Sequence, residues 1–297
     1  MQKNQQALCF GLGAVFLWST VATAFKLALR QLQPLQLLFL AACTACLMLL
    51  AIIITSGRWQ PLLAIPTHDR NKNLLLGILN PGLYYMVLFK AYDLLPAQEA
   101  QALNYTWAIT LALLSVPMLK QRLHKTDLAA LLLSYCGVLI IATHGKPWLL
   151  EFSSTAGVAL ALGSTLLWSF FWLINVKNHQ DPVLSLFLNF LGGLPFITVT
   201  MLLFSSFPPL GTVWLAAIYV GCFEMGFTFI LWLKALTSSD SVAWIGNLIF
   251  LSPFISLVLI YWLLGEPILF SSVIGLVLII FGTLWQQQGR LRSWFTR

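Results

Sequence analysis

Long apolar stretches alternate with short polar loops along the whole chain. Each of ten stretches is close to twenty residues long, and a helix of about that length crosses a hydrocarbon core of ~30 Å. No linker or low-complexity segment indicates a separate soluble domain. The pattern therefore predicts an all-α integral membrane protein with ten transmembrane helices, at residues 7–29, 34–55, 73–95, 97–119, 126–143, 155–177, 182–205, 210–236, 239–264 and 267–288.

The composition favours the same class. Charged residues make up 8% of the chain and hydrophobic residues 59%, whereas about 25% of the residues of a soluble domain are charged. The first stretch contains Ala22-Thr23-Ala24, which resembles the cleavage site of a secretory signal. Its apolar part is too long for a signal peptide, and Lys26 follows at once. We predict that this stretch is retained as a helix.

The chain also repeats itself. Residues 16–19 are Phe-Leu-Trp-Ser and residues 166–169 are Leu-Leu-Trp-Ser, and residues 88–91 (Leu-Phe-Lys-Ala) are answered by residues 232–235 (Trp-Leu-Lys-Ala). Two copies of a unit with an odd number of spans lie upside down relative to each other and build a central site. We predict two inverted five-helix repeats, which occupy residues 1–146 and 147–297.

The basic residues predict the orientation. Of the 16 Lys and Arg residues, 12 fall on the side of the N-terminus, and the other four are Lys26, Arg30, Lys90 and Lys146. Because basic residues collect in cytoplasmic loops, both termini are predicted to be cytoplasmic in a bacterial-type inner membrane. The net charge of +7 is then a topology signal, and the scattered charges predict no nucleic-acid partner.

A single carboxylate lies deep within a predicted span. Glu224 stands ten residues before Lys234, which places it about 15 Å from that interface. The 144-residue offset of the second repeat brings Asn80 to a matching depth, and Tyr84 and Thr228 follow four residues later on the same faces. A buried acid is costly in lipid, so Glu224 is a candidate proton carrier or partner of a substrate amine. The alternative is a protonated Glu that bonds to a neighbouring helix.

Tryptophans form a second constellation near the midplane. Trp18, Trp107 and Trp168 lie far from the interfaces where tryptophan usually collects. Asn104 shares the face of Trp107, and Trp172 shares the face of Trp168. Such side chains suit a pocket for amphipathic organic molecules, with ordinary core packing as the alternative.

Other residues give weaker signals. Asn247 could face the same cavity or bridge two helices, and Glu99 and Asp93 are predicted to be solvated charges near the outer mouth. The glycines of the fifth and tenth helices, among them Gly137 and Gly275, predict close helix packing or else a homodimer contact.

Several classes of function lack a sequence signal. The four His residues show no metal-ligand spacing, and the five Cys residues lie within apolar stretches. The chain has no Walker A loop, GxSxG elbow or HExxH motif. We therefore predict no cofactor, no metal and no enzymatic activity.

At this point the chain resembles the EamA-type drug/metabolite transporters over its whole length. The motifs that carry the resemblance are Leu17-Trp18-Ser19-Thr20, Gly265-Glu266-Pro267 and the pair Gly275 and Gly282. The resemblance implies ten helices in two repeats with both termini inside.

Within that family, Glu99-Ala100, Asn104-Tyr105 and Trp107 are similar to the bacterial aromatic amino-acid exporter branch. The branch has Pro where this chain has Ala108, and the first repeat has Gln121-Arg122 where Gly-Glu is expected. In the branch, tryptophans that match Trp18, Trp107 and Trp168 line the central cavity.

These observations predict a lipid-embedded secondary transporter of small amphipathic molecules, chiefly an amino-acid exporter, which works by alternating access. Multidrug efflux and nutrient uptake are alternatives because an inverted repeat has no preferred direction. A membrane scaffold or an intramembrane enzyme is a more remote one. Glu224 is compatible with proton antiport, and downhill facilitation is the other mode of coupling.

Overall fold

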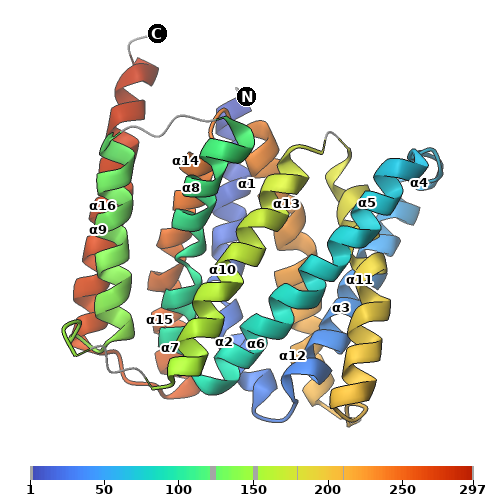
Figure 1. The fold of residues 1–297 in the computed structure, drawn as a ribbon, viewed down its shortest axis with the longest axis horizontal. Coiled ribbons are helices and arrows are strands. Elements are labelled where there is room, and N and C mark those ends of the chain that lie inside the picture. The colour runs from blue at the N-terminus through green and yellow to red at the C-terminus, as the bar shows by residue number, and fades with distance from the viewer. Residues whose placement is uncertain (1–2, 121–124, 150–152, 179, 210, 296–297) are drawn as a thin grey trace.

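The regular elements of the computed structural model are all helices in the residues that it describes, which are 3–120, 125–149, 153–178, 180–209 and 211–295 (Figure 1). Seven helical runs are long and apolar enough to cross a membrane within this part of the chain. Three shorter apolar helices span Leu128–Ile141, Ser252–Leu264 and Phe270–Gly282.

Every predicted span falls on a helix or a run of helices. The first half contains α1 (Lys3–Trp18) and α2 (Val21–Leu29), α3 (Pro34–Thr55), the short α4 (Trp59–Leu63), α5 (Thr67–Gly77), η1 (Ile78–Leu83) and α6 (Tyr84–Leu94), α7 (Ala97–Asn104) and α8 (Trp107–Leu119), and α9 (Lys125–Ala142). The second half contains α10 (Thr155–Val176), α11 (Pro182–Phe204), α12 (Val213–Tyr219), η2 (Val220–Phe227) and α13 (Thr228–Ser238), α14 (Val242–Asn247), η3 (Leu248–Leu251) and α15 (Ser252–Leu264), and α16 (Phe270–Phe295).

Local sequence signals set several helix ends. Pro34 opens α3 after a capping box in which the Gln33 backbone N–H donates to Oε1 of Gln36 at 2.9 Å. Ser154 caps α10 by accepting from the backbone N–H of Gly157. Gly265 ends α15 with a φ of 73°, a left-handed conformation that costs glycine little.

Five of the predicted spans are interrupted. The segments η1 and η2 are wider π-helical turns inside the third and eighth spans. Pro81 lacks a backbone N–H, and the backbone of Asn80 is extended with φ −148° and ψ 121°. The third and eighth spans are therefore not regular α-helices at these points. π-helical turns are uncommon and concentrate at functional sites.

The helices run alternately between two ends of the molecule. The chain starts α1 and finishes α16 at the same end, at the top of Figure 1. We call this the terminal end, and the other the opposite end. The pair α9 and α16 lies at one side of the bundle, and α3 packs on α11 at the other.

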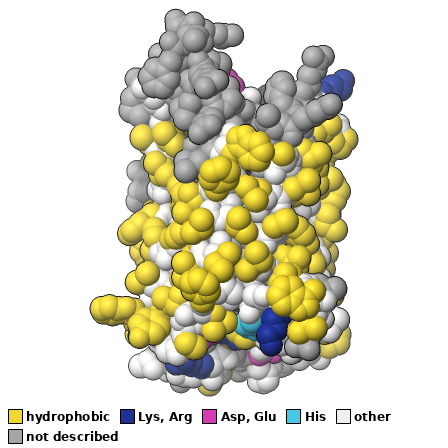
Figure 2. All heavy atoms as spheres, turned by 90° about the vertical axis from the view of Figure 1, so that its left-hand side faces the viewer, with side chains coloured by type: hydrophobic (Ala, Val, Ile, Leu, Met, Phe, Trp, Pro, Cys, Tyr) yellow, Lys and Arg dark blue, Asp and Glu magenta, His cyan; other side chains and the backbone are white. Residues whose placement is uncertain are grey.

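An apolar belt surrounds the molecule between these ends. Figure 2 shows hydrophobic side chains over the middle of the α9–α16 face, with charged side chains gathered at its lower rim. Large apolar side chains such as Leu203, Trp262 and Phe270 are exposed. A belt of this kind suits contact with lipid.

Glycine brings α9 and α16 into backbone contact. A Cβ atom on Gly137 would lie 2.3 Å from the carbonyl oxygen of Gly275, and one on Gly275 would lie 2.4 Å from the carbonyl oxygen of Gly137. Both glycines therefore serve packing within the chain, which was the first of the two interpretations of these residues.

Adding one methyl group at this contact should destabilise the fold. We expect Gly137→Ala to lower the free energy of unfolding by about 1–3 kcal/mol, because α9 and α16 must separate to admit the Cβ atom. Thermal unfolding of the detergent-purified protein measures the effect. Gly163→Ala is the matched control, since a Cβ atom there meets nothing within 4 Å. Equal melting temperatures for the two variants would contradict this account.

Candidate functional site

Three predicted tryptophans meet at the centre of the bundle. The ring centroid of Trp18 lies 6.3 Å from that of Trp107 and 5.8 Å from that of Trp168, and the last two are 6.0 Å apart. All three rings are buried. They come from α1, α8 and α10, so the contact joins helices of both halves of the chain.

Two more tryptophans extend this cluster. Trp172 lies 5.3 Å from Trp168 between ring centroids, as its shared helix face predicts. Trp232 on α13 lies 5.0 Å from Trp18 and 5.4 Å from Trp107. Sequence reasoning missed Trp232 as a site residue, although it belongs to the repeated motif at residues 232–235 and follows Glu224 by eight positions.

Glu224 reaches the same centre from η2. The hydroxyl group of Tyr85 donates a hydrogen bond of 2.6 Å to Oε1 of Glu224. The side chain of Glu224 is buried, and its Oε2 has no hydrogen-bond partner among the described residues. Glu224 also neighbours the indole of Trp18 in the wall of the central cavity.

Of the two residues predicted to share faces with Asn80 and Glu224, Tyr84 lines the central cavity and Thr228 does not. Tyr84 packs on Trp168 with ring centroids 4.4 Å apart, and its hydroxyl oxygen accepts from Nδ2 of Asn104 at 3.4 Å. Thr228 donates its hydroxyl proton to the backbone carbonyl of Phe223, five residues earlier. The four-residue spacing that placed Thr228 beside Glu224 assumed an α-helix, and the π-helical turn changes which side chains share a face.

Asn80 is completely buried within η1. Neither atom of its side-chain amide has a hydrogen-bond partner in the described part of the chain. It is not among the residues that line the central cavity. The side chain of Asn247, another predicted site residue, lies outside the described residues, although its backbone ends α14.

The central cavity is almost closed. Its volume is about 20 Å³, which is room for about one water molecule. Six of the predicted site residues line this cavity with aromatic, amide and carboxyl groups, namely Trp18, Tyr84, Asn104, Trp107, Trp168 and Glu224. A substrate of amino-acid size therefore requires the helices to move apart.

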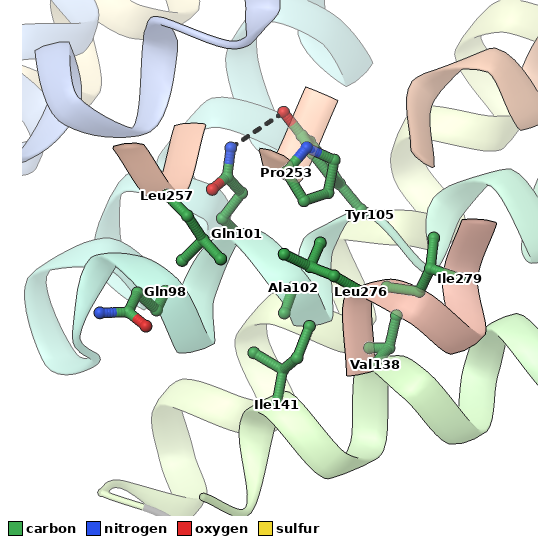
Figure 3. Close-up of a pocket in the computed structure, with 10 residues that line it drawn as sticks. All are labelled: Gln98, Gln101, Ala102, Tyr105, Val138, Ile141, Pro253, Leu257, Leu276 and Ile279. Carbon is green, nitrogen blue, oxygen red and sulfur yellow. Dashed lines mark hydrogen bonds between the residues drawn. The ribbon is translucent and has the colours of Figure 1, made fainter. Parts of the chain in front are cut away.

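A chain of hydroxyl and amide groups runs beside the cavity, where the first and fourth spans are broken. Ser252 accepts from the hydroxyl of Ser19 at 3.1 Å and shares a hydrogen bond of 2.9 Å with Tyr105. Gln101 donates to the hydroxyl of Tyr105 at 3.1 Å, as Figure 3 shows. The apolar cavity drawn there, between α7, α9, α15 and α16, holds about 10 Å³. These bonds supply partners that lipid does not offer to an interrupted helix.

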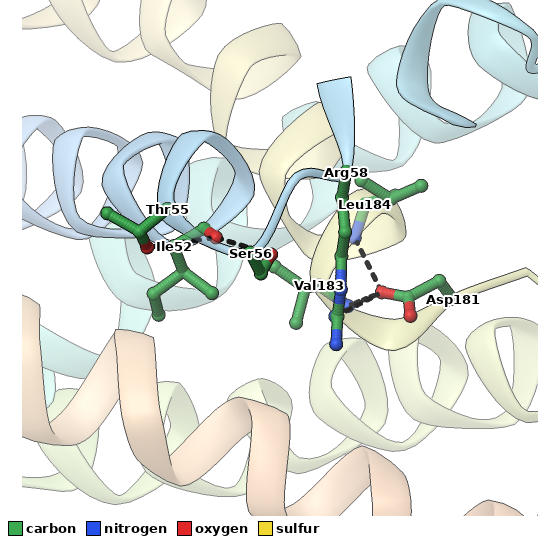
Figure 4. Close-up of polar contacts among 7 residues, drawn as sticks. All are labelled: Ile52, Thr55, Ser56, Arg58, Asp181, Val183 and Leu184. Atoms are coloured by element: carbon green, nitrogen blue, oxygen red, sulfur yellow. Dashed lines mark hydrogen bonds and ion pairs between the residues drawn. The ribbon is translucent and has the colours of Figure 1, made fainter. Parts of the chain in front are cut away.

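Polar side chains close the terminal end. Asn73 on α5 donates to Oε1 of Gln180 at 2.7 Å and accepts from Nδ2 of Asn178 at 2.9 Å. Arg58 forms an ion pair of 3.1 Å with Asp181, whose carboxylate also caps α11 (Figure 4). This end is held by hydrogen bonds between the third, sixth and seventh spans.

Aromatic side chains close the opposite end. The ring of Phe25 on α2 lies 4.8 Å from that of Phe89 and 5.2 Å from that of Tyr92 between centroids. Lys26 donates a hydrogen bond of 2.7 Å to the backbone carbonyl of Tyr92. The two ends are therefore closed by different chemistry.

The prediction that Glu99 is a solvated loop charge was wrong. Its side chain is 1% exposed, and Oε1 pairs with Nε2 of His144 at 3.0 Å and accepts from the hydroxyl of Ser153 at 2.6 Å. These partners arrive from distant segments of the chain, so local sequence gave no sign of the burial. Asp93 is exposed and pairs with Lys90 at 2.6 Å.

Comparison with known proteins gives a consistent family. Residues 5–143 and 155–285 each match the model of the EamA-like transporter family. An uncharacterized transporter of Archaeoglobus fulgidus is 25% identical over 279 residues, which cover 90% of this chain and 92% of that protein. The uncharacterized transporter YvbV of Bacillus subtilis is 24% identical over 287 residues, which cover 94% of this chain and 90% of that protein. A crystal structure of another protein shares the fold with a TM-score of 0.78, at 22% identity over 97% of this chain and 99% of that one.

The bond between Tyr85 and Glu224 should carry measurable stability. We expect Tyr85→Phe to lower the free energy of unfolding by about 1–3 kcal/mol, because a buried carboxyl oxygen loses its donor. Tyr84→Phe is the matched control and should cost less, since its hydroxyl has only a contact of 3.4 Å with Asn104. Thermal unfolding in detergent provides the measurement.

The same effect should depend on Glu224. In a Glu224→Met background, Tyr85→Phe should cost clearly less than in the natural chain, because the acceptor is gone. An equal loss of melting temperature in both backgrounds would show that the hydroxyl of Tyr85 acts through another group.

Proposed function

Because the protein belongs to the EamA-like transporter family, we propose that it carries small amphipathic metabolites, and amino acids in particular, through its centre by alternating access. The observation that carries the proposal is the meeting of Trp18, Trp107 and Trp168 with Glu224 around one cavity. Indole rings offer apolar walls with an N–H donor, and a carboxyl group suits an amine. Aromatic amino acids combine both kinds of group.

A twofold relation between the halves supports inverted repeats. The turns η1 and η2 occupy matching places. Gly77 directly precedes η1, and Gly221, 144 positions later, is the second residue of η2. A Cβ atom on Gly77 would lie 1.9 Å from the carbonyl oxygen of Asn189 on α11, and one on Gly221 would lie 2.5 Å from that of Ala41 on α3. The third span of each half thus meets the second span of the other half in the same way.

The helices divide into two groups that meet at the central cavity. One group consists of the third, fourth, sixth and seventh spans, and the other of the first, second, eighth and ninth spans. Contacts within each group follow the same plan, since α6 packs on α10 in one and α13 packs on α1 in the other. The hydrogen bond from Tyr85 to Glu224 crosses between the groups. Rocking of one group against the other would open the cavity to either side.

The two closures fit such a cycle. Opening at the terminal end would break the Arg58–Asp181 pair, because Arg58 follows α3 of one group and Asp181 precedes α11 of the other. Opening at the opposite end requires Phe25 to leave Phe89 and Tyr92. The present structure is closed at both ends around a cavity of about 20 Å³, which suits the occluded step between the two open states.

The role of Glu224 has two forms within this proposal. A buried carboxyl group can carry a proton across the midplane, or its charged form can hold the amine of the substrate. Proton carriage couples export to a pH gradient, whereas an amine contact leaves transport downhill.

The transport assay decides both the proposal and the role of Glu224. We expect the purified protein in liposomes to catalyse counterflow of radiolabelled L-phenylalanine. If Glu224 carries protons, Glu224→Gln abolishes transport driven by a pH gradient and preserves exchange at equal pH, since an amide does not titrate. If Glu224 binds the amine, both activities fall by about tenfold or more.

Asn80→Ala is the control at matching depth. It should leave the pH dependence of transport unchanged, because the amide does not titrate. Normal transport by Glu224→Gln in both assays would show that the carboxyl group is structural, and no counterflow by the natural chain would remove amino acids as the substrate.

The basic residues also support an orientation of the protein across the membrane. We propose that the terminal end is cytoplasmic, since Arg58, Arg70 and Lys72 lie there, and that the opposite end with Lys26, Arg30 and Lys90 faces outward. The two exposed residues Trp59 and Trp148 lie at different ends of the bundle.

Cysteine labelling in intact cells tests this orientation. A membrane-impermeant maleimide should label Trp148→Cys readily and should leave Trp59→Cys unlabelled until the membrane is opened. The reverse order would place the terminal end outside and overturn the charge-based orientation.

A further inference from the structure

A second, larger cavity opens at the opposite end of the bundle. Its volume is about 470 Å³, within the range of small-molecule sites. Four of the side chains that line it are ionisable, namely Lys26, Glu99, His144 and Glu266. They come from α2, α7, the segment after α9 and the segment after α15. We call this the outer cavity.

Both carboxylates of the outer cavity offer an acceptor. Glu99 is almost fully buried, its Oε1 is used by His144 and Ser153, and its Oε2 has no partner among the described residues. Glu266 accepts from the backbone N–H of Ala97 at 3.3 Å through Oε1, and its buried Oε2 likewise has no partner there. A buried carboxylate oxygen without a donor is costly unless something else supplies one.

The outer cavity also contains a cation. Lys26 is half-buried and donates to the backbone carbonyl of Tyr92 at 2.7 Å. An ammonium group has three donors, and Glu266 lines the same cavity. The wall thus combines two carboxylate acceptors with an ammonium donor, which complements a molecule that bears both an amine and a carboxylate.

We propose that the outer cavity is a second binding site for such amphoteric molecules, in which Glu99 and Glu266 hold the ammonium group and Lys26 holds the carboxylate. This inference rests on the proposed function, because it makes the outer cavity the place where a substrate stops between the medium and the centre. Phe25 and Tyr92 line the central cavity, and Lys26 follows Phe25 directly and bonds to Tyr92. The aromatic closure therefore adjoins both sites.

Protection of an introduced cysteine tests the site without requiring transport. Leu269 lines the outer cavity, so Leu269→Cys in the full chain, held in lipid nanodiscs, should react with a water-soluble maleimide beyond the background of the five native cysteines. L-phenylalanine should slow this reaction, and 3-phenylpropionate, which lacks the amine, should not.

Removing either carboxylate should weaken the protection. In the Leu269→Cys chain, Glu99→Gln and Glu266→Gln should each raise the half-protecting concentration of L-phenylalanine by about tenfold, the loss of one charge-assisted hydrogen bond. Asp240→Asn makes a similar carboxylate-to-amide change at the terminal end, outside the cavity, and should leave that concentration unchanged.

A variant of the central tryptophan cluster distinguishes binding at the outer cavity from binding at the central cavity. Protection should persist in Trp168→Ala, because Trp168 does not line the outer cavity. Loss of protection in Trp168→Ala, absence of protection in the natural background, or equal protection in both Glu variants and the parent would each overturn the second site. Protection without any counterflow of L-phenylalanine would retain the outer site and reject the proposed transport of amino acids.

Discussion

The burial of one carboxyl group in the middle of an apolar bundle is the constraint on which the centre of this protein depends. Lipid offers no hydrogen-bond partner at that depth, so the protein must supply the donor itself. Tyr85 does so across the boundary between the two helix groups. A bond that crosses this boundary holds the groups together in the closed form, and its loss accompanies any separation of them. The proposed rocking motion would therefore break this bond and change the surroundings of the buried carboxyl group.

The interrupted helices follow from the same constraint. A π-helical turn leaves backbone carbonyl groups without their usual donors, and Thr228 satisfies one of them by bonding to Phe223. The breaks at Ser19 and Tyr105 are met by the hydroxyl of Ser252. Each irregular segment is therefore buried against protein, where polar side chains can reach it. Residues of η2 and η3, and residues beside the breaks in the first and fourth spans, line the central cavity.

Much of the fold could be predicted from sequence, whereas the site could be predicted only in part. The span positions follow from the lengths of the apolar stretches, and the depth of the tryptophans follows from counting residues to the nearest lysine. The choice of Tyr85 over Tyr84 as partner of Glu224 could not be predicted, because it depends on how η1 and η2 rotate the helices. The burial of Glu99 was missed for a similar reason, since His144 and Ser153 lie 45 and 54 positions away in the sequence. Local spacing describes faces of regular helices and says little about contacts between distant segments.

The side chains that close the two ends of the bundle differ in chemistry: one end is closed by polar and charged groups and the other by aromatic rings. The 144-residue offset that relates Asn80 to Glu224 carries Asn73 to Ala217, so the hydrogen-bonding residue of one half is apolar in the other. Separating the Arg58–Asp181 ion pair exposes charged groups that water can solvate, whereas separating Phe25 from Phe89 exposes apolar surface that water does not stabilise. Solvation of these groups by water would therefore offset part of the free-energy cost of breaking the bonds at the terminal end. In the proposed cycle, chemically unequal ends would give the two open states unequal free energies, and this inequality would give a direction-neutral architecture a preferred resting state.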